Sequence, residues 1–145
     1  MDSIEEIASG LNSTAIHLIR RLRREDSKLK IGPARLSALS VLVFGGSCSL
    51  GELAGYEQVT SATMSRVVSG LVDSGFARRK PSRTDARAVL IEATAKGRRL
   101  MLKGQLARVK SLSGSLADLD SADLRCLQRA VEVLRRLENA GSSAV

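Results

Sequence analysis

The feature that most constrains the fold of this chain is a helical pattern followed at once by two short strand patterns. Apolar residues recur every three or four positions between residues 60 and 74 and predict a helix that Gly75 ends. Residues 76–80 and 88–93 are typical of strands, and the turn-forming residues 81–87 join them into a hairpin. The expected fold class is therefore mainly α with a small β-hairpin (α+β).

A shorter helix, predicted over 50–56, precedes this unit and gives it the layout of a helix-turn-helix. Leu53 and Ala54 are expected to pack the short helix, with the small Ala54 where the two helices cross. Gln58 stands where the turn usually has glycine, so the match is incomplete, and an ordinary helical hairpin gives the same pattern. The hairpin after the second helix favours a winged helix-turn-helix, whose basic hairpin reaches phosphates or a minor groove.

The charge of the chain is concentrated in the same region. Residues 61–100 hold nine Lys/Arg against three Asp/Glu, a net +6 of the total +8. Such a patch suggests a polyanionic partner, although a solvated basic face gives the same count. Aromatic residues make up only 2% of the chain. This scarcity disfavours binding to RNA or single strands, where bases stack on aromatic rings.

Long amphipathic helices are predicted at both ends of the chain. Ser3 and Glu6 have capping-box spacing and predict a helix over 3–24, and further helices are predicted over 94–116 and from 120 or 121 onward. An excess of apolar side chains lies on Leu11, Leu18, Leu127, Val131 and Leu134. The excess favours a homodimer formed through these helices, with a self-contained monomeric bundle as the alternative.

One further helix is expected to form the buried centre of the fold. Gly32 and Pro33 predict its start, and Gly45 with Gly46 predicts its end. Its residues 36–44 are apolar nearly all round.

Two motifs resemble the multiple antibiotic resistance regulator (MarR) family of bacterial transcription factors. The wing motif of that family is Asp-x-Arg, six residues, then Thr-x-x-Gly, and the chain has it as Asp85-Ala86-Arg87 and Thr94-Ala95-Lys96-Gly97. Ala93 replaces the Leu that usually precedes the Thr, which weakens packing there. Residues 59–68 also look like the recognition helix of the family.

The resemblance implies a single MarR-like domain over 1–145, in which 32–97 bind DNA and 1–31 with 98–145 form dimerisation helices. It implies a ligand-responsive repressor that binds a pseudo-palindromic duplex as a homodimer. By position, the DNA-binding residues are Ser61, Thr63, Ser65, Arg66, Arg83 and Arg87. Asp85 is expected to be structural, its carboxylate holding an arginine in place.

Relatives release DNA when a small aromatic or phenolic acid enters a crevice beside the dimer helices. His17, Arg21 and Arg35 are candidates to meet the carboxylate of such an effector, although solvation explains them equally well.

Other classes of function find little support in the sequence. His17 is the only histidine and no catalytic motif is present, so we expect no enzyme, no metal and no cofactor. Cys48 and Cys126 have no metal-ligand spacing and are expected to be ordinary thiols. The acidic start and the short apolar stretches predict a cytoplasmic protein without a membrane span. The alternative function is a winged-helix module that binds proteins rather than DNA.

Overall fold

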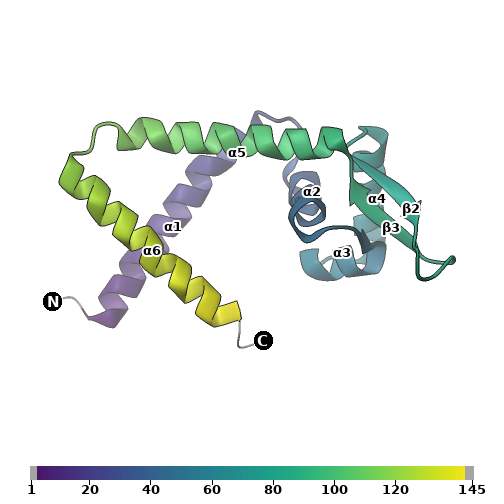
Figure 1. Cartoon of the computed structure of the whole chain (residues 1–145), viewed down its shortest axis with the longest axis horizontal. Coiled ribbons are helices and arrows are strands. Elements are labelled where there is room, and N and C mark those ends of the chain that lie inside the picture. Colours follow the sequence, from purple (N-terminus) through teal and green to yellow (C-terminus); the bar gives the residue numbers. More distant parts are fainter. Residues whose placement is uncertain (1–2, 143–145) are drawn as a thin grey trace. The chain divides into compact units, whose positions relative to one another are not determined.

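The computed structural model describes residues 3–142, and its described part consists of helices with a small antiparallel sheet (Figure 1). The chain divides into two compact units, residues 1–108 and 109–145. The elements are α1 (Ile4–Ser27), α2 (Pro33–Gly45), β1 (Cys48–Ser49), α3 (Leu50–Glu57), α4 (Ser61–Asp73), β2 (Ala77–Pro81), β3 (Val89–Ala93), α5 (Ala95–Leu116) and α6 (Ser121–Ser142). The expected fold class, mainly α with a small β element, is confirmed.

Local capping explains where the helices begin. The capping box of α1 is present, because the Ser3 hydroxyl accepts from the Glu6 backbone N–H and the Glu6 carboxylate accepts from that of Ser3. Ser49 caps α3 and Thr60 caps α4 by half of this arrangement, because their hydroxyls accept from the backbone N–H groups of Glu52 and Thr63. Pro33 occupies the first turn of α2, where its missing N–H costs nothing.

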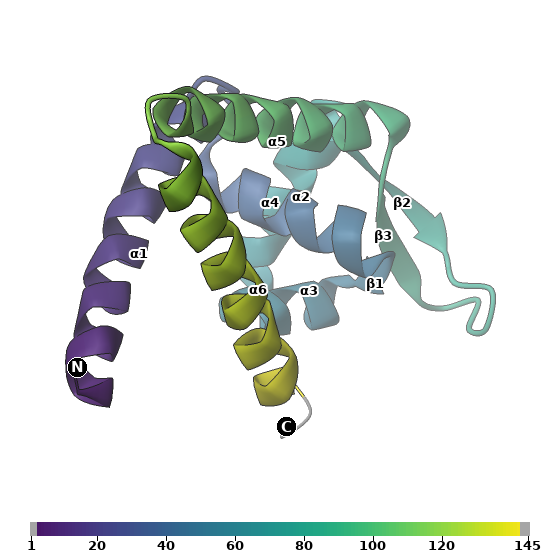
Figure 2. The same ribbon diagram turned by 60° about the vertical axis from the view of Figure 1, so that its left-hand side comes forward.

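The core of the first unit lies between α2, α3, α4 and the sheet, which are neighbours in both views (Figures 1 and 2). Its most buried large side chains are Leu39, Leu53, Met64, Val68, Leu71 and Ile91. The expectation that residues 36–44 form the buried centre of the fold is confirmed for one face of the helix. Only Ala38, Leu39 and Leu42 of that segment are buried, and Phe44 is 73% exposed. The reason is that the other core elements cover one face of α2 only.

The sheet has a strand that sequence patterning did not predict. Its order is β1-β3-β2 with antiparallel pairing throughout, so β3 lies between the hairpin strand β2 and the two-residue strand β1. Cys48 of β1 pairs with Ile91 and is buried, and this burial raises the pKa of its thiol.

The Thr-x-x-Gly motif fastens the end of α4 to the start of α5. The Thr94 hydroxyl donates to the Gly75 carbonyl oxygen at 2.6 Å and accepts from the Gly97 backbone N–H at 3.1 Å. A Cβ on Gly97 would clash with the Phe76 carbonyl oxygen. The Thr94 hydroxyl and the bare Gly97 backbone therefore allow α5 to start directly against the core.

The end of α1 is tied to α5 within the first unit, although no residue of α1 is buried. Arg108 forms an ion pair with Asp26, and Leu29 packs against Gly104. The apolar positions of the rest of α1 are exposed, among them Ile4 at 86%.

The second unit holds the end of α5 and all of α6. The Asp120 carboxylate accepts from the Asp123 backbone N–H and caps α6. The apolar stripe expected for this helix is present, and Leu127 and Val131 on it are exposed. Across residues 3–142, no helix has both the length and the hydropathy that crossing a membrane requires.

Candidate nucleic-acid interface

Helix α4 presents a polar face on the side opposite its buried face. Met64, Val68 and Leu71 are buried against the core. Of the four predicted contact residues on this helix, Ser61, Thr63 and Arg66 are exposed, whereas Ser65 is half-buried. A face of small hydroxyls with one arginine suits close approach to a base edge or a phosphate.

The turn before α4 keeps helix-turn-helix geometry without glycine. Gln58 adopts the left-handed conformation with φ 55° and ends α3, and its N–H bonds to the carbonyl oxygens at the end of that helix. The Val59 N–H then donates to the Ala54 carbonyl oxygen at 3.1 Å. Gln58 thus takes the conformation for which glycine is usual here.

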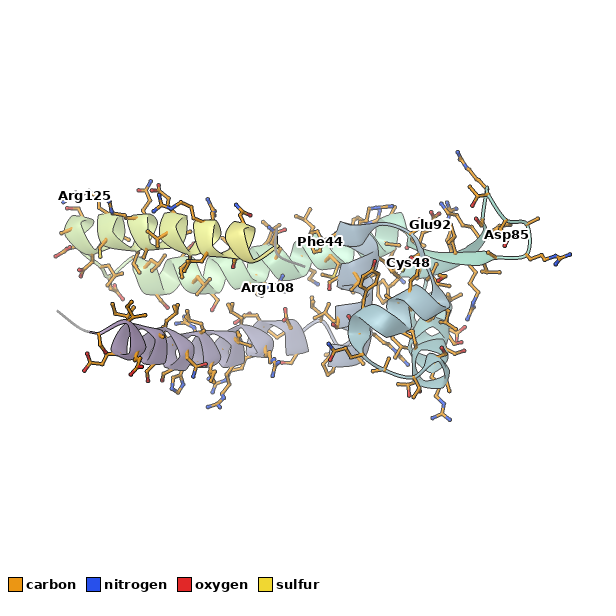
Figure 3. All side chains as sticks on the ribbon, turned by 90° about the horizontal axis from the view of Figure 1, so that it is seen from below. Phe44, Cys48, Asp85, Glu92, Arg108 and Arg125 are labelled. Carbon is orange, nitrogen blue, oxygen red and sulfur yellow. The ribbon has the colours of Figure 1, made fainter. Side chains whose placement is uncertain are left out.

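The loop of the hairpin is closed by Asp85 (Figure 3). Its carboxylate accepts from the Arg87 backbone N–H at 3.0 Å, and its carbonyl oxygen accepts from the Ala88 N–H at 3.0 Å. We expected this carboxylate to hold an arginine side chain, but no ion pair joins Asp85 to an arginine within residues 3–142. Asp85 shapes the loop through its backbone contacts, and Arg83 and Arg87 on this loop are exposed.

Glu92 neutralises part of the basic charge at the base of the hairpin. Its carboxylate pairs with Arg78 and Lys80 of β2, which lie on the same face of the sheet. These two hydrogen-bonded cations lower the pKa of Glu92 from the usual 4.5 to about 2. The hairpin therefore offers free positive charge at its loop rather than on this face.

Arg79 is an interface candidate that sequence reasoning missed. Alternation along β2 places it on the face opposite Arg78, toward α4. Its guanidinium donates to the Ser69 hydroxyl on the polar face of α4 at 3.2 Å, and its side chain is otherwise exposed. The alternation of the strand indicates that Arg78 and Arg79 point to opposite faces of the sheet. Only the pairing of Arg79 with the buried Ile91 shows that Arg79 lies on the face toward the core.

The three effector candidates lie on different elements. His17 and Arg21 are exposed on α1, and Arg35 is in the first turn of α2, with its guanidinium against Gly70 of α4. His17 is ten residues, or about 15 Å of helix rise, before the end of α1. Nothing described within residues 3–142 brings the three side chains into one cluster. Those residues also contain no group of His, Cys, Asp and Glu that could hold a metal ion.

The chain is similar to known proteins over most of its length. The model of the MarR family matches residues 31–89, which run from before α2 to the start of β3. An HTH-type transcriptional regulator of Mycobacterium bovis is 32% identical over 137 residues, covering 94% of this chain and 96% of that protein. The chain belongs to the MarR family. MarR proteins are DNA-binding transcription regulators rather than enzymes, and the resemblance found in the wing motif is thereby confirmed.

Solved structures of MarR regulators share the fold over nearly the whole chain. A transcriptional regulator from Thermotoga maritima superposes with a TM-score of 0.86 at 21% identity, covering 97% of this chain and 99% of that one. A MepR mutant of S. aureus, solved bound to an oligodeoxyribonucleotide, gives a TM-score of 0.70 at 15% identity, with coverages of 92% and 97%.

Proposed function

We propose that this MarR regulator is a homodimeric, ligand-responsive repressor that binds a pseudo-palindromic operator. The observation that carries the proposal is the exposed polar face of α4 beside a hairpin loop with two exposed arginines. In a winged helix, such a face enters the major groove while the loop reaches phosphates or the minor groove.

Burial supports the proposed division of the chain into a DNA-binding part and a dimerisation part. Residues 32–97 hold nearly all of the core and form the DNA-binding part. Residues 1–31 and 98–145 form the dimerisation part, within one MarR domain spanning 1–145. Support comes from the exposed apolar positions of both end helices, which include Leu11 and Leu18 of α1 and Leu127 and Val131 of α6 at 42–45% exposure. A second copy of the chain would cover them.

We assign each predicted contact residue to a different part of the DNA. Ser61, Thr63, Ser65 and Arg66 face the major groove or its phosphates, and Ser65, being half-buried, contributes least. Arg83 and Arg87 contact the backbone beside the minor groove, while Asp85 fixes the shape of their loop. Arg79 contacts a phosphate beside Ser69.

Effector response and repression complete the proposal. The solved structure of NadR, which shares the fold with a TM-score of 0.61 at 18% identity, is in complex with 4-hydroxyphenylacetate. We propose a small aromatic or phenolic acid here too, with His17, Arg21 and Arg35 as the first candidates for its carboxylate. Such an acid releases DNA only if it favours a dimer arrangement that does not fit the groove spacing. The protein acts in the cytoplasm, where it blocks transcription from its operator.

The test is selection of binding sites from random duplexes, followed by affinity measurements at several salt concentrations. We expect an enriched palindrome with half-site centres about 34 Å apart and a Kd of about 10⁻⁸ M or tighter. Arg66→Ala should cost about 1–3 kcal/mol at one operator position if it reads a base. Arg87→Ala should weaken binding to all sequences and reduce the salt slope by about one ion.

Three outcomes would count against the proposal. Selection that enriches no palindrome contradicts operator recognition, and an Arg87→Ala variant with the affinity of the parent at every salt concentration contradicts the wing contact. A panel of aromatic acids that leaves operator affinity unchanged contradicts the effector response.

A further inference from the structure

One arginine outside the helix-turn-helix and the wing lies directly on helix α4. Arg35 belongs to the first turn of α2, yet its guanidinium covers Gly70 of α4. A Cβ built on Gly70 would overlap with Nε, Cζ and Nη2 of Arg35, at nearly equal distances from all three. Because three atoms of the planar group are equally close to that point, the guanidinium lies flat over the glycine. Any larger residue at position 70 would displace it.

The place of Gly70 on the helix puts this guanidinium on the polar side of α4. Gly70 follows Arg66 by four residues, so the two share one side of the helix about 6 Å apart along its axis. The buried stripe of Met64, Val68 and Leu71 lies on the other side. Arg79 of β2 meets the adjacent Ser69. Arginines from three different elements thus surround the second half of the polar face of α4.

Among residues 3–142, no ion pair joins this cluster of Arg35, Arg66 and Arg79 to an acidic residue. Arg35 is exposed, and no ion pair to it is present among residues 3–142. The acidic residue nearest in sequence on α4 is Asp73, three positions after Gly70, and it forms no ion pair with Arg35 there. Like charges on one face repel each other, so the arrangement favours an incoming polyanion.

We propose that Arg35 contacts a DNA phosphate, and that Gly70, which has no side chain, leaves room for its guanidinium against the recognition helix. This proposal rests on the DNA-binding mode proposed above. The position favours phosphate over base, because the first residues of a recognition helix meet base edges and Gly70 is the tenth residue of α4. An effector contact, the other role proposed for Arg35, would change the effector response without changing DNA affinity.

The experiment measures affinity for operator and scrambled duplexes over a salt series, using the full-length protein. Arg35→Ala is expected to weaken binding to both duplexes at least about threefold and to reduce the salt slope by about one. Arg20→Ala, which removes the same charge from an exposed position on α1, is the matched control and should leave the slope unchanged.

Gly70→Ala tests whether Gly70 positions the Arg35 guanidinium. The variant should fold as well as the parent, because the atoms nearest its methyl group belong to the end of the exposed Arg35 side chain and alanine favours helices. It should weaken DNA binding in the same direction as Arg35→Ala. The double variant should bind as Arg35→Ala does, because Gly70 acts only through that side chain.

Arg35→Ala with the affinity and salt slope of the parent overturns the proposal, and so does a loss of effector response without a loss of DNA affinity. If the double variant binds DNA more weakly than Arg35→Ala alone, Gly70 does not act only by positioning Arg35. Failure of the proposed function looks different, since the parent would then bind operator and scrambled duplexes equally. The phosphate contact of Arg35 is still measurable on the scrambled duplex in that case.

Discussion

The winged-helix region and the end helices both carry apolar patterns, but among residues 3–142 the chain itself buries only the first. Leu39, Leu53 and Val68 in the winged-helix region are 0% exposed. In α1 no residue is buried, and in α6 Leu137 is 62% exposed. An apolar stripe on a helix therefore predicts that this face is buried against another surface, but it does not show that the surface belongs to the same chain.

Helix α5 has both kinds of surface, one buried by the chain and one left exposed. Its first half packs through Gly97, Met101 and Gly104, which are buried, whereas Leu102, Leu106 and Val109 are more than half exposed. The first set faces the core of the first unit, and the second set adds to the apolar surface that we assign to a second copy of the chain.

The largest expected effect comes from placing a charge on an uncovered stripe. Leu127→Glu should abolish dimerisation and operator binding, because it buries a carboxylate in the proposed interface, and an obligate dimer often has no stable monomer. Sedimentation velocity with an operator-binding assay measures both. Gln128→Glu adds the same charge at the next, polar position of α6 and is the control. Equal behaviour of the two variants would show that the stripe is not an interface.

A smaller effect is expected where the chain is already closely packed. Gly97→Ala should lower the free energy of unfolding by about 1–3 kcal/mol or more, because its Cβ meets the Phe76 carbonyl oxygen. Gly114→Ala, later on the same helix, meets nothing within 4 Å and should stabilise the protein by up to about 1 kcal/mol. Denaturant unfolding compares them. If Gly97→Ala were as stable as the parent, the close contact between α5 and the backbone of Phe76 would be refuted.

The smallest effect concerns the ion pairs of Glu92 at the base of the hairpin. Its pKa is lowered to about 2, so its stabilising contribution is present above pH 4.5 and is lost as the pH falls toward 2. Glu92→Gln should unfold at a lower temperature than the parent at neutral pH, and the difference should shrink on acidification. Thermal unfolding at pH 7, 4 and 2.5 tests this, and a difference independent of pH would contradict it.

Sequence patterns predicted the elements whose signals are local. The capping pair Ser3 and Glu6 marked the start of α1, and Gly75, at φ 78°, marked the end of α4. Strand β1 was missed because two residues carry no periodicity, and it exists only through pairing with β3.

The part of the proposed interface that sequence patterns missed depends on contacts between elements distant in the sequence. Arg79 meets Ser69 across ten residues, and Arg35 meets Gly70 across a whole helix-turn-helix. Neither pair has a spacing that a pattern could reveal. The role of Asp85 was identified in outline only, because an Asp can bind a side chain or its own loop backbone, and the fold of the loop decides between them.

The mass of the protein in solution tests the central claim most directly, since the end helices are expected to be completed by a second copy. Multi-angle light scattering over a dilution series at micromolar concentration should give twice the chain mass of 15.5 kDa. A folded 15.5 kDa monomer that persists across the series would contradict the account.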